Sequence, residues 1–291
     1  MYAQFFGAYL LNNNHVTREQ LTEAFSKVND AHIKLGTLAI HQGLMTASEV
    51  DEVCLMQTRE DKRFGNIAVE RGYLTDEQVS DLLKAQNPDY LLLGQILVDI
   101  GALDNTKLET LLIDYQSDAE IFEMDYDSND KTDRLIQKFF QISETPVTDY
   151  TVMYLSLLFN NLVRFVGGDY TPLAPVPVKE YPVNFCVNQK VIGEKNFVSR
   201  IDMTPEVAIQ FATRYAKMDF TEFDEYVKAS LEDFVNLHNG LFTVNMSNEY
   251  SMDLTLEPPV QDETEVLILN EASYVIPVIY PFGTIHFIVS F

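Results

Sequence analysis

A repeat of 29 residues dominates the first 116 residues and constrains their fold more than any other feature of the sequence. Its clearest markers are four equally spaced glycines: Gly7, Gly36, Gly65 and Gly94. Seven residues after each marker come Asn14, Gly43, Gly72 and Gly101, so the same register holds in a second column. A fixed period of this length is typical of supersecondary units that stack on one another. The sequence therefore predicts four 29-residue units over residues 1–116.

Each unit has the pattern of a helix, a turn and a second helix. In the third unit, Gly72 suits the left-handed position that ends a helix. Thr75, with Gln78 three residues later, forms a capping box for the next helix, whose apolar residues recur at helical spacing from Val79. Because one unit cannot bury its own apolar face, neighbouring units must stack. We therefore expect an all-α N-terminal domain with units one and four as its caps.

Units two and three share a longer motif. Unit two runs from Lys34-Leu35-Gly36 to Gln57, unit three runs from Arg63-Phe64-Gly65 to Gln86, and five residues separate them. This arrangement resembles the MshEN domain of type II secretion and type IV pilus ATPases, where two motifs of the form RLGxxLxxxGLLxxxxLxxxLxxQ bind cyclic di-GMP. The resemblance implies cyclic di-GMP as a ligand and assigns its binding to eight residues: Lys34, Leu35, Gly36, Gln57, Arg63, Phe64, Gly65 and Gln86.

The residue types suit such a ligand, although the motif departs from the family. The forked guanidinium of Arg63 fits a guanine edge or a phosphate, and Gly36 and Gly65 allow a ligand to approach the backbone. The family's leading Arg is replaced by Lys34 in unit two and by Leu92 in unit four. A second interpretation therefore stays open, in which the glycines are close-packing points and the repeat is a ligand-free interaction module.

Charge and composition exclude several classes of function. The chain has 44 acidic and 20 basic side chains and a net charge of −24, which argues against DNA, RNA or an anionic membrane as a partner. We expect a cytoplasmic protein, because no apolar run approaches the ~20 residues of a membrane helix and the N-terminus lacks the features of a signal peptide. The two cysteines and five histidines show no metal-ligand spacing. His238 is interpreted as a capping or solvated residue near a helix end.

The pattern changes after the repeat. Residues 117–147 begin with an acidic stretch and are expected to be a linker with a connecting helix. Residues 148–291 are expected to form an α+β domain with a largely antiparallel sheet. Its predicted helices are 150–166, 204–218 and a third from about 221 to Asn239-Gly240, and its predicted strands are 181–192, 196–203, 241–247, 251–257, 264–270 and 273–291.

The third of these helices carries the most informative motif. Asp233 and Asn236 are three residues apart, which makes them neighbours on a helix surface, and Gly240 follows four residues later. This spacing resembles the ExxNxxxG motif of the CheX/CheC/FliY chemotaxis phosphatases, and the order of elements over residues 148–291 agrees with that family. The resemblance implies a CheX-like fold.

The same resemblance implies a reaction and a partner. The family hydrolyses the aspartyl phosphate of the CheY response regulator, so Asn236 would orient the attacking water and Asp233 would dock the receiver domain. The receiver would bring its own Mg²⁺, and no metal or other intrinsic cofactor is expected in this chain. Asp233 is one methylene shorter than the family's Glu, and Glu232, four residues before Asn236, could substitute for it. A second motif copy around Asn161 is absent or inactive.

Two functions follow from these patterns. In the first, this is a bacterial signalling protein that couples a cyclic di-GMP-binding repeat to a CheX-like domain, and that domain binds and dephosphorylates a CheY-type receiver. In the second, it is a non-enzymatic adaptor with degenerate sites. If the apolar segment 284–291 forms a sheet edge, a symmetric homodimer through that edge is also expected.

Overall fold

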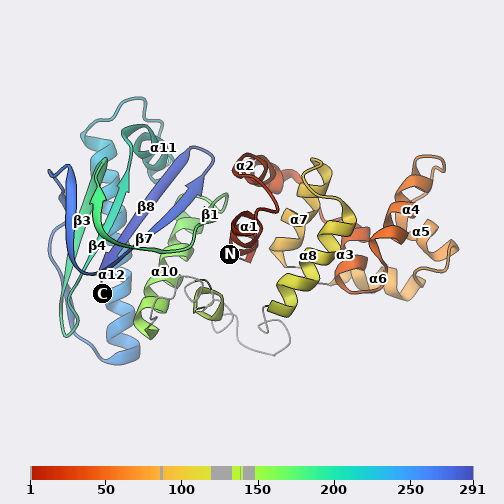
Figure 1. The fold of residues 1–291 in the computed structure, drawn as a ribbon, viewed down its shortest axis with the longest axis horizontal. Coiled ribbons are helices and arrows are strands. Elements are labelled where there is room, and N and C mark those ends of the chain that lie inside the picture. Colours follow the sequence, from red (N-terminus) through yellow and green to blue (C-terminus); the bar gives the residue numbers. More distant parts are fainter. Residues whose placement is uncertain (1, 86–87, 119–132, 138, 140–147, 291) are drawn as a thin grey trace. The chain divides into compact units, whose positions relative to one another are not determined.

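The computed structural model describes residues 2–85, 88–118, 133–137, 139 and 148–290. The chain divides into two compact units, residues 2–125 and residues 126–291, and both are drawn in Figure 1. The predicted linker, 117–147, lies largely outside the described residues, so its structure stays a prediction. None of the helices in the described ranges has the length and apolarity needed to cross a membrane.

Four pairs of helices make up the described part of the N-terminal unit. They are α1 (Tyr2–Asn12) and α2 (Arg18–Lys27), α3 (Leu35–His41) and α4 (Ala47–Gln57), α5 (Phe64–Glu70) and α6 (Asp76–Lys84), and α7 (Asp89–Asp99) and α8 (Asn105–Asp118), with a short 3-10 helix η1 (Val28–Asp30) after α2. In each pair the turn contains one residue with a left-handed backbone, at φ values of 56°, 65°, 76° and 73°: Asn14, Gly43, Gly72 and Gly101.

Local sequence accounts for where the second helix of each pair begins. Thr75 and Gln78 form the predicted capping box, in which each side chain accepts a hydrogen bond from the other residue's backbone N–H. The same box starts α2 and α4. At the start of α8, Asp104 Oδ1 accepts from the Lys107 backbone N–H at 2.7 Å. These caps satisfy backbone donors that the first turn of a helix leaves unpaired.

The pairs do not stack in the order of the sequence. Helix α7 packs against α1 and α2 on one side and against α3 on the other, α8 packs against α4, and α3 packs against α5 and α6. Figure 1 shows α7 between α1 and α3. The expectation that unit four is an outer cap is therefore wrong. The physical reason is that α7 buries residues around most of its circumference, including Leu91, Leu93, Ile96 and Leu97, so it needs neighbours on several sides.

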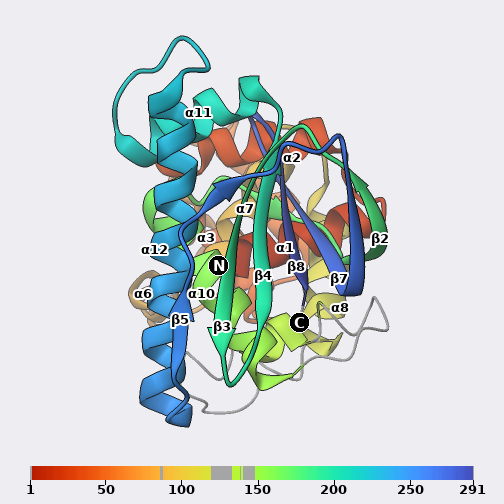
Figure 2. The same cartoon turned by 90° about the vertical axis from the view of Figure 1, so that its left-hand side faces the viewer.

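The C-terminal unit combines three described long helices with an antiparallel sheet (Figure 2). Its helices are α10 (Asp149–Phe165), α11 (Pro205–Ala216) and α12 (Glu225–Tyr250), and its strands are β1 (Thr171–Pro172), β2 (Val176–Pro182), β3 (Phe185–Gly193), β4 (Phe197–Met203), β5 (Leu254–Leu256), β6 (Val260–Gln261), β7 (Val266–Tyr280) and β8 (Gly283–Ser290). The strand order is β1-β7-β8-β4-β3-β5, with β2 also paired to β7 and β6 to β3. Helix α12 packs on β3, β4 and β5, and α10 and α11 pack against α12. The predicted α+β class with an antiparallel sheet agrees with this unit.

Helix α12 is longer than predicted. It continues through Gly240 to Tyr250, so the predicted end at Asn239-Gly240 and the predicted strand 241–247 are wrong. Phe242 and Met246 extend the buried stripe of the helix by two turns, and this burial outweighs the modest cost of a glycine inside a helix. The helix ends where Ser251 takes a left-handed conformation, with φ of 55°.

The C-terminal hairpin differs from expectation in one consequential way. The predicted break near Pro281 is confirmed, because β7 and β8 form a hairpin there. Strand β8, however, lies between β7 and β4 and pairs with both. Segment 284–290 is therefore internal to the sheet, and the edge-to-edge argument for a homodimer loses its structural basis.

Candidate functional site

Two of the three predicted catalytic residues share one exposed face of α12. Asp233 and Asn236 are both exposed, and Gly240 follows one turn later on the same helix. No atom lies within 4 Å of the position that a Cβ at Gly240 would occupy. The structure therefore presents a carboxylate, an amide and an open stretch of backbone side by side on an accessible helix surface.

A hydrogen bond from a residue of the sheet holds the side-chain amide of Asn236 in place. Its Oδ1 accepts a hydrogen bond of 2.8 Å from Nε2 of Gln189, a fully buried residue of β3. Gln189 was not among the site residues predicted from the sequence. The signal that could have found it is a long polar side chain at an inward-facing position of a strand, between Val187 and Val191, where apolar residues are the rule.

Each acidic residue of the motif also has a partner. Asp233 Oδ2 accepts a hydrogen bond of 2.6 Å from the Tyr215 hydroxyl of α11. Partial burial raises the pKa of Tyr215, and the Asp233 carboxylate raises it further. The phenol therefore stays protonated and acts as a donor. Glu232 is half-buried, and its Oε1 accepts from Nε2 of Gln261 at 2.8 Å. Glu232 is thus engaged by β6, whereas Asp233 is engaged by α11.

An open apolar groove of about 620 Å³ adjoins Asp233 between α11 and α12. Two of its lining side chains, Met218 and Tyr226, are 62% and 74% exposed. The complete lining is Phe165, Tyr215, Ala216, Met218, Phe220, Tyr226, Ala229, Ser230 and Asp233. Asp233 therefore belongs both to the motif and to the wall of this groove.

His238 is not the capping or solvated residue that was expected. It is 2% exposed, and its Nδ1 lies 3.2 Å from Nδ2 of Asn161 on α10. The ring of Tyr154 meets it edge-on at 4.5 Å between centroids. Burial lowers the pKa of His238 to about 3, so this histidine is neutral and belongs to the core. Asn161 is itself buried and contacts this histidine.

In the N-terminal unit, five of the eight predicted ligand-binding residues line one pocket of about 430 Å³. These five are Lys34, Leu35, Gly36, Gln57 and Phe64. Arg63 is exposed at the start of α5, neither it nor Gly65 lines this pocket, and Gln86 lies outside the described residues. The remaining lining residues include Gln95, Val98, Asp99 and Asn105, which belong to unit four.

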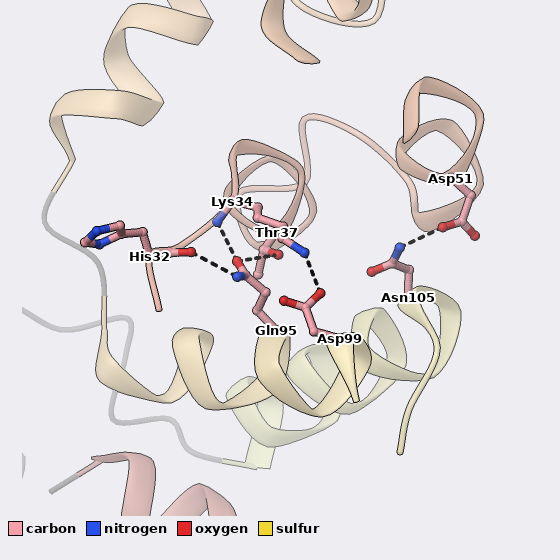
Figure 3. A network of polar contacts seen from close by, with 7 residues as sticks. All are labelled: His32, Lys34, Thr37, Asp51, Gln95, Asp99 and Asn105. Carbon is pink, nitrogen blue, oxygen red and sulfur yellow. Dashed lines mark hydrogen bonds and ion pairs between the residues drawn. The ribbon is translucent and has the colours of Figure 1, made fainter. Parts of the chain in front are cut away.

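Polar contacts tie units two and four together at this pocket (Figure 3). The Lys34 ammonium pairs with the Asp99 carboxylate, and the Lys34 backbone N–H donates to Oε1 of Gln95. Gln95 Nε2 donates to the His32 carbonyl at 3.0 Å. At the other end, Asn105 Nδ2 donates to Asp51 Oδ1 at 2.6 Å. The ammonium of Lys34, which the resemblance assigns to ligand binding, is therefore already paired with the carboxylate of Asp99 in unit four.

The repeat glycines are close-packing points. A Cβ at Gly36 would lie 2.8 Å from Val50 Cγ1 and 3.2 Å from Phe64 Cζ. A Cβ at Gly65 would lie 3.1 Å from Val79 Cγ1 and 3.2 Å from Leu35 Cδ2. Units two and three thus pack reciprocally, each placing an apolar side chain against the other's glycine. This geometry supports the packing interpretation of the glycines, and it leaves ligand binding a prediction.

The described residues contain no group of three or more His, Cys, Asp or Glu side chains arranged to hold a metal ion. Cys54 is exposed and Cys186 is buried, and both are free thiols.

Comparisons with known proteins give structural matches only. No family model and no curated protein matches the chain, so the resemblance of the repeat to MshEN stays a prediction. In its C-terminal half, the chain is similar to the chemotaxis protein CheX from Desulfovibrio desulfuricans, with 15% identity, 49% of this chain and 98% of that chain covered, and a TM-score of 0.43. CheX from Vibrio vulnificus matches with 13% identity, coverage of 49% and 99%, and a TM-score of 0.43. The CheX-CheY-BeF3-Mg complex from Borrelia burgdorferi matches with 17% identity, coverage of 49% and 97%, and a TM-score of 0.40.

Proposed function

We propose that the C-terminal unit binds a phosphorylated receiver domain of the CheY type and hydrolyses its aspartyl phosphate at the exposed face of α12. The observation that carries the proposal is the pair formed by Asp233 and Asn236. Both side chains are exposed and one turn apart, and each is held by a hydrogen bond from a neighbouring element, Tyr215 for the acid and Gln189 for the amide. Side chains fixed in this way are suited to catalysis by positioning.

The chemistry needs no covalent intermediate on this chain. A water oxygen forms a bond to phosphorus while the bond between phosphorus and the receiver's aspartyl oxygen breaks, which releases inorganic phosphate and restores the carboxylate. In-line geometry and charge stabilisation are the main requirements of such a transfer. Asn236 positions the water, Asp233 pairs with a cation of the receiver, and the receiver brings Mg²⁺ as part of the substrate.

The length of Asp233 is the main departure from the family pattern. A carboxylate one methylene shorter reaches less far from the helix, and Glu232, which is engaged by Gln261 of β6, is less free to replace it. We therefore expect slow hydrolysis in the natural chain and faster hydrolysis in Asp233→Glu.

The test uses a CheY-type receiver from the same genome, labelled with ³²P on its aspartate, and follows loss of label with and without the full chain. Acceleration that falls by ~100-fold in Asn236→Ala supports the proposal. Asn248→Ala is the matched control, because Asn248 is an exposed asparagine near the far end of the same helix, and it should behave as the natural chain. Equal decay with the natural chain, with Asn236→Ala and with no added protein would refute hydrolysis.

The alternative function, a non-enzymatic adaptor, predicts a separable result. Such a protein would bind a receiver loaded with beryllium fluoride without hastening loss of phosphate, and Asp233→Glu would leave it inactive. Calorimetry with that stable mimic therefore distinguishes an inactive docking domain from an enzyme.

A second proposal concerns the N-terminal unit, where we propose that cyclic di-GMP binds at the pocket between units two and four. The observation that favours it is the convergence of Lys34, Gly36 and Gln57 with the apolar Leu35 and Phe64 on one cavity. The opposing factor is charge, because a ligand phosphate has to compete with a carboxylate for the ammonium of Lys34.

The structure makes this competition testable. Asp99→Asn removes the competing charge and should tighten cyclic di-GMP binding by up to ~5-fold, because exposed ion pairs contribute at most about 1 kcal/mol. Lys34→Ala should abolish binding, and Arg63→Ala tests whether the guanidinium reaches a ligand seated there. No calorimetric heat with the natural chain or with Asp99→Asn would leave the repeat a scaffold.

A further inference from the structure

Gln189 occupies an unusual position for its residue type. It lies in β3 with no exposed surface, and both atoms of its amide are used. Nε2 donates to Asn236 Oδ1 at 2.8 Å and to the Glu257 carbonyl at 2.9 Å, and Oε1 accepts from Asn239 Nδ2 at 2.8 Å. Burying an amide costs free energy, which its hydrogen bonds must offset. An amide whose N–H and C=O groups are all hydrogen-bonded is also held rigidly.

This network determines which way the Gln189 amide points. The backbone carbonyl of Glu257 can only accept a hydrogen bond, so the Gln189 atom facing it must be the nitrogen. The same nitrogen faces Asn236, so the Asn236 atom that meets it must be the oxygen. The Asn236 nitrogen, with its two N–H donors, is then turned away from the sheet.

We propose that Gln189 is a positioning residue, which holds the Asn236 amide so that its NH₂ group, rather than its oxygen, serves the reacting phosphate or water. The inference rests on the proposed hydrolysis at α12 and extends it in two ways. It adds a residue from the sheet to a site otherwise built on a helix. It also assigns Asn236 the role of donor, either to a phosphoryl oxygen or to the oxygen of the attacking water.

The physical gain is preorganisation. An unrestrained asparagine amide turns about its last torsion between two opposite orientations and also changes rotamer. With Gln189 in place, one orientation is selected before the receiver arrives, so catalysis does not have to order the group. Loss of this restraint should lower kcat by ~10-fold and leave KM nearly unchanged, because docking depends on Asp233 and on the helix surface.

The first test replaces Gln189 with Met, which has similar volume and makes no comparable hydrogen bond. We expect kcat for release of labelled phosphate to fall ~10-fold. The same substitution should have no further effect in an Asn236→Ala background, because Gln189 would act through that residue. Tyr154→Phe is the matched control. It removes another buried hydrogen bond of the same unit, to Ser199 at 2.7 Å, and should lower stability without changing kcat.

The second test leaves Gln189 in place and serves if Gln189→Met fails to fold. In Asn236→Asp, Gln189 still donates to the inner oxygen, while an acceptor replaces the outward NH₂ group. If Asn236 acts as a donor, Asn236→Asp should lose activity but still bind the receiver, with a KM close to that of the natural chain. Retained or increased activity in Asn236→Asp, or a Gln189→Met chain with unchanged kcat, would overturn the inference. If the natural chain shows no hydrolysis, the proposed function fails first. The restraint on the amide can then still be measured by NMR. The side-chain NH₂ signals of Asn236 should be sharp with Gln189 present and averaged between orientations in Gln189→Met.

Discussion

Replacing His238 with Asn should remove a large part of the acid sensitivity of the C-terminal unit. The Asn side-chain oxygen can take the place of Nδ1 as acceptor for Asn161, so the core contact is kept and the titrating ring is lost. In the natural chain, protonation of His238 is unfavourable for two reasons. A proton at Nδ1 would face the NH₂ donor of Asn161, and the charged ring would lie at a site that is only 2% exposed.

The magnitude follows from linkage. Burial lowers the folded-state pKa of His238 from 6.5 to about 3. The unfolded state therefore binds the proton more readily, and stability falls as the pH drops below 6.5. Between pH 7.5 and pH 5.0 the loss amounts to about 2 kcal/mol from this residue alone. Below about pH 3 the loss levels off, because the folded state then also binds the proton.

The assay is urea unfolding of the full chain at both pH values, followed by hydrogen exchange of α12 and β3 amides, because the chain contains no tryptophan. The natural chain should lose about 2 kcal/mol more than His238→Asn between the two pH values. His286, whose pKa is also lowered by burial, adds to the pH dependence of both proteins and cancels in the difference. A His238 ring signal that titrates near pH 6, or an equal pH dependence in both proteins, would refute the reasoning.

Three further predictions follow from packing and exposure. Gly36→Ala should destabilise the N-terminal unit by about 1–3 kcal/mol in thermal unfolding, because its Cβ would lie 2.8 Å from Val50. Gly240→Ala, which meets no atom within 4 Å, should instead stabilise α12 by about 0.5–1 kcal/mol, and weaker receiver binding in that variant would show that the partner approaches the helix backbone there. Alkylation should modify Cys54, which is exposed, and spare buried Cys186. Burial and Asp51 raise the pKa of Cys54, so its reaction should speed up with rising pH, and cyclic di-GMP should slow it if the ligand occupies the pocket.

Local patterns predicted the elements whose causes are local. The capping box at Thr75 and the left-handed turn at Gly72 depend on residues within a few positions, and the structure has them where the sequence placed them. The position of α7 between other units was not predicted, because helical periodicity shows which residues are buried and not which neighbour buries them. The end of α12 was misplaced because Gly240 is a helix-stop signal locally, whereas Phe242 and Met246 are buried only once the sheet is present.

The residues that organise both candidate sites were missed for the same reason. Gln95 and Gln189 are buried glutamines whose partners lie far along the chain, 61 and 47 residues away at Lys34 and Asn236. A sequence pattern marks such a residue only as a polar interruption in an apolar segment, which carries no information about its partner. The structure shows that each one joins a neighbouring element to the residue predicted to bind or react.

This parallel leads to a prediction about the N-terminal unit. Gln95→Met should leave the Lys34 backbone N–H and the His32 carbonyl without their partners, at a cost of about 1–3 kcal/mol for each polar group that stays buried. The effect should be local, because the side-chain hydrogen bonds of Gln95 go to His32, Lys34 and Thr37 at the start of α3. Hydrogen exchange at the start of α3 should accelerate by ~10-fold or more, while exchange in α6 changes little. Unchanged hydrogen-exchange protection of the Lys34 amide in Gln95→Met would contradict this prediction. It would mean that apolar packing alone positions α3 and that the hydrogen bonds of Gln95 do not.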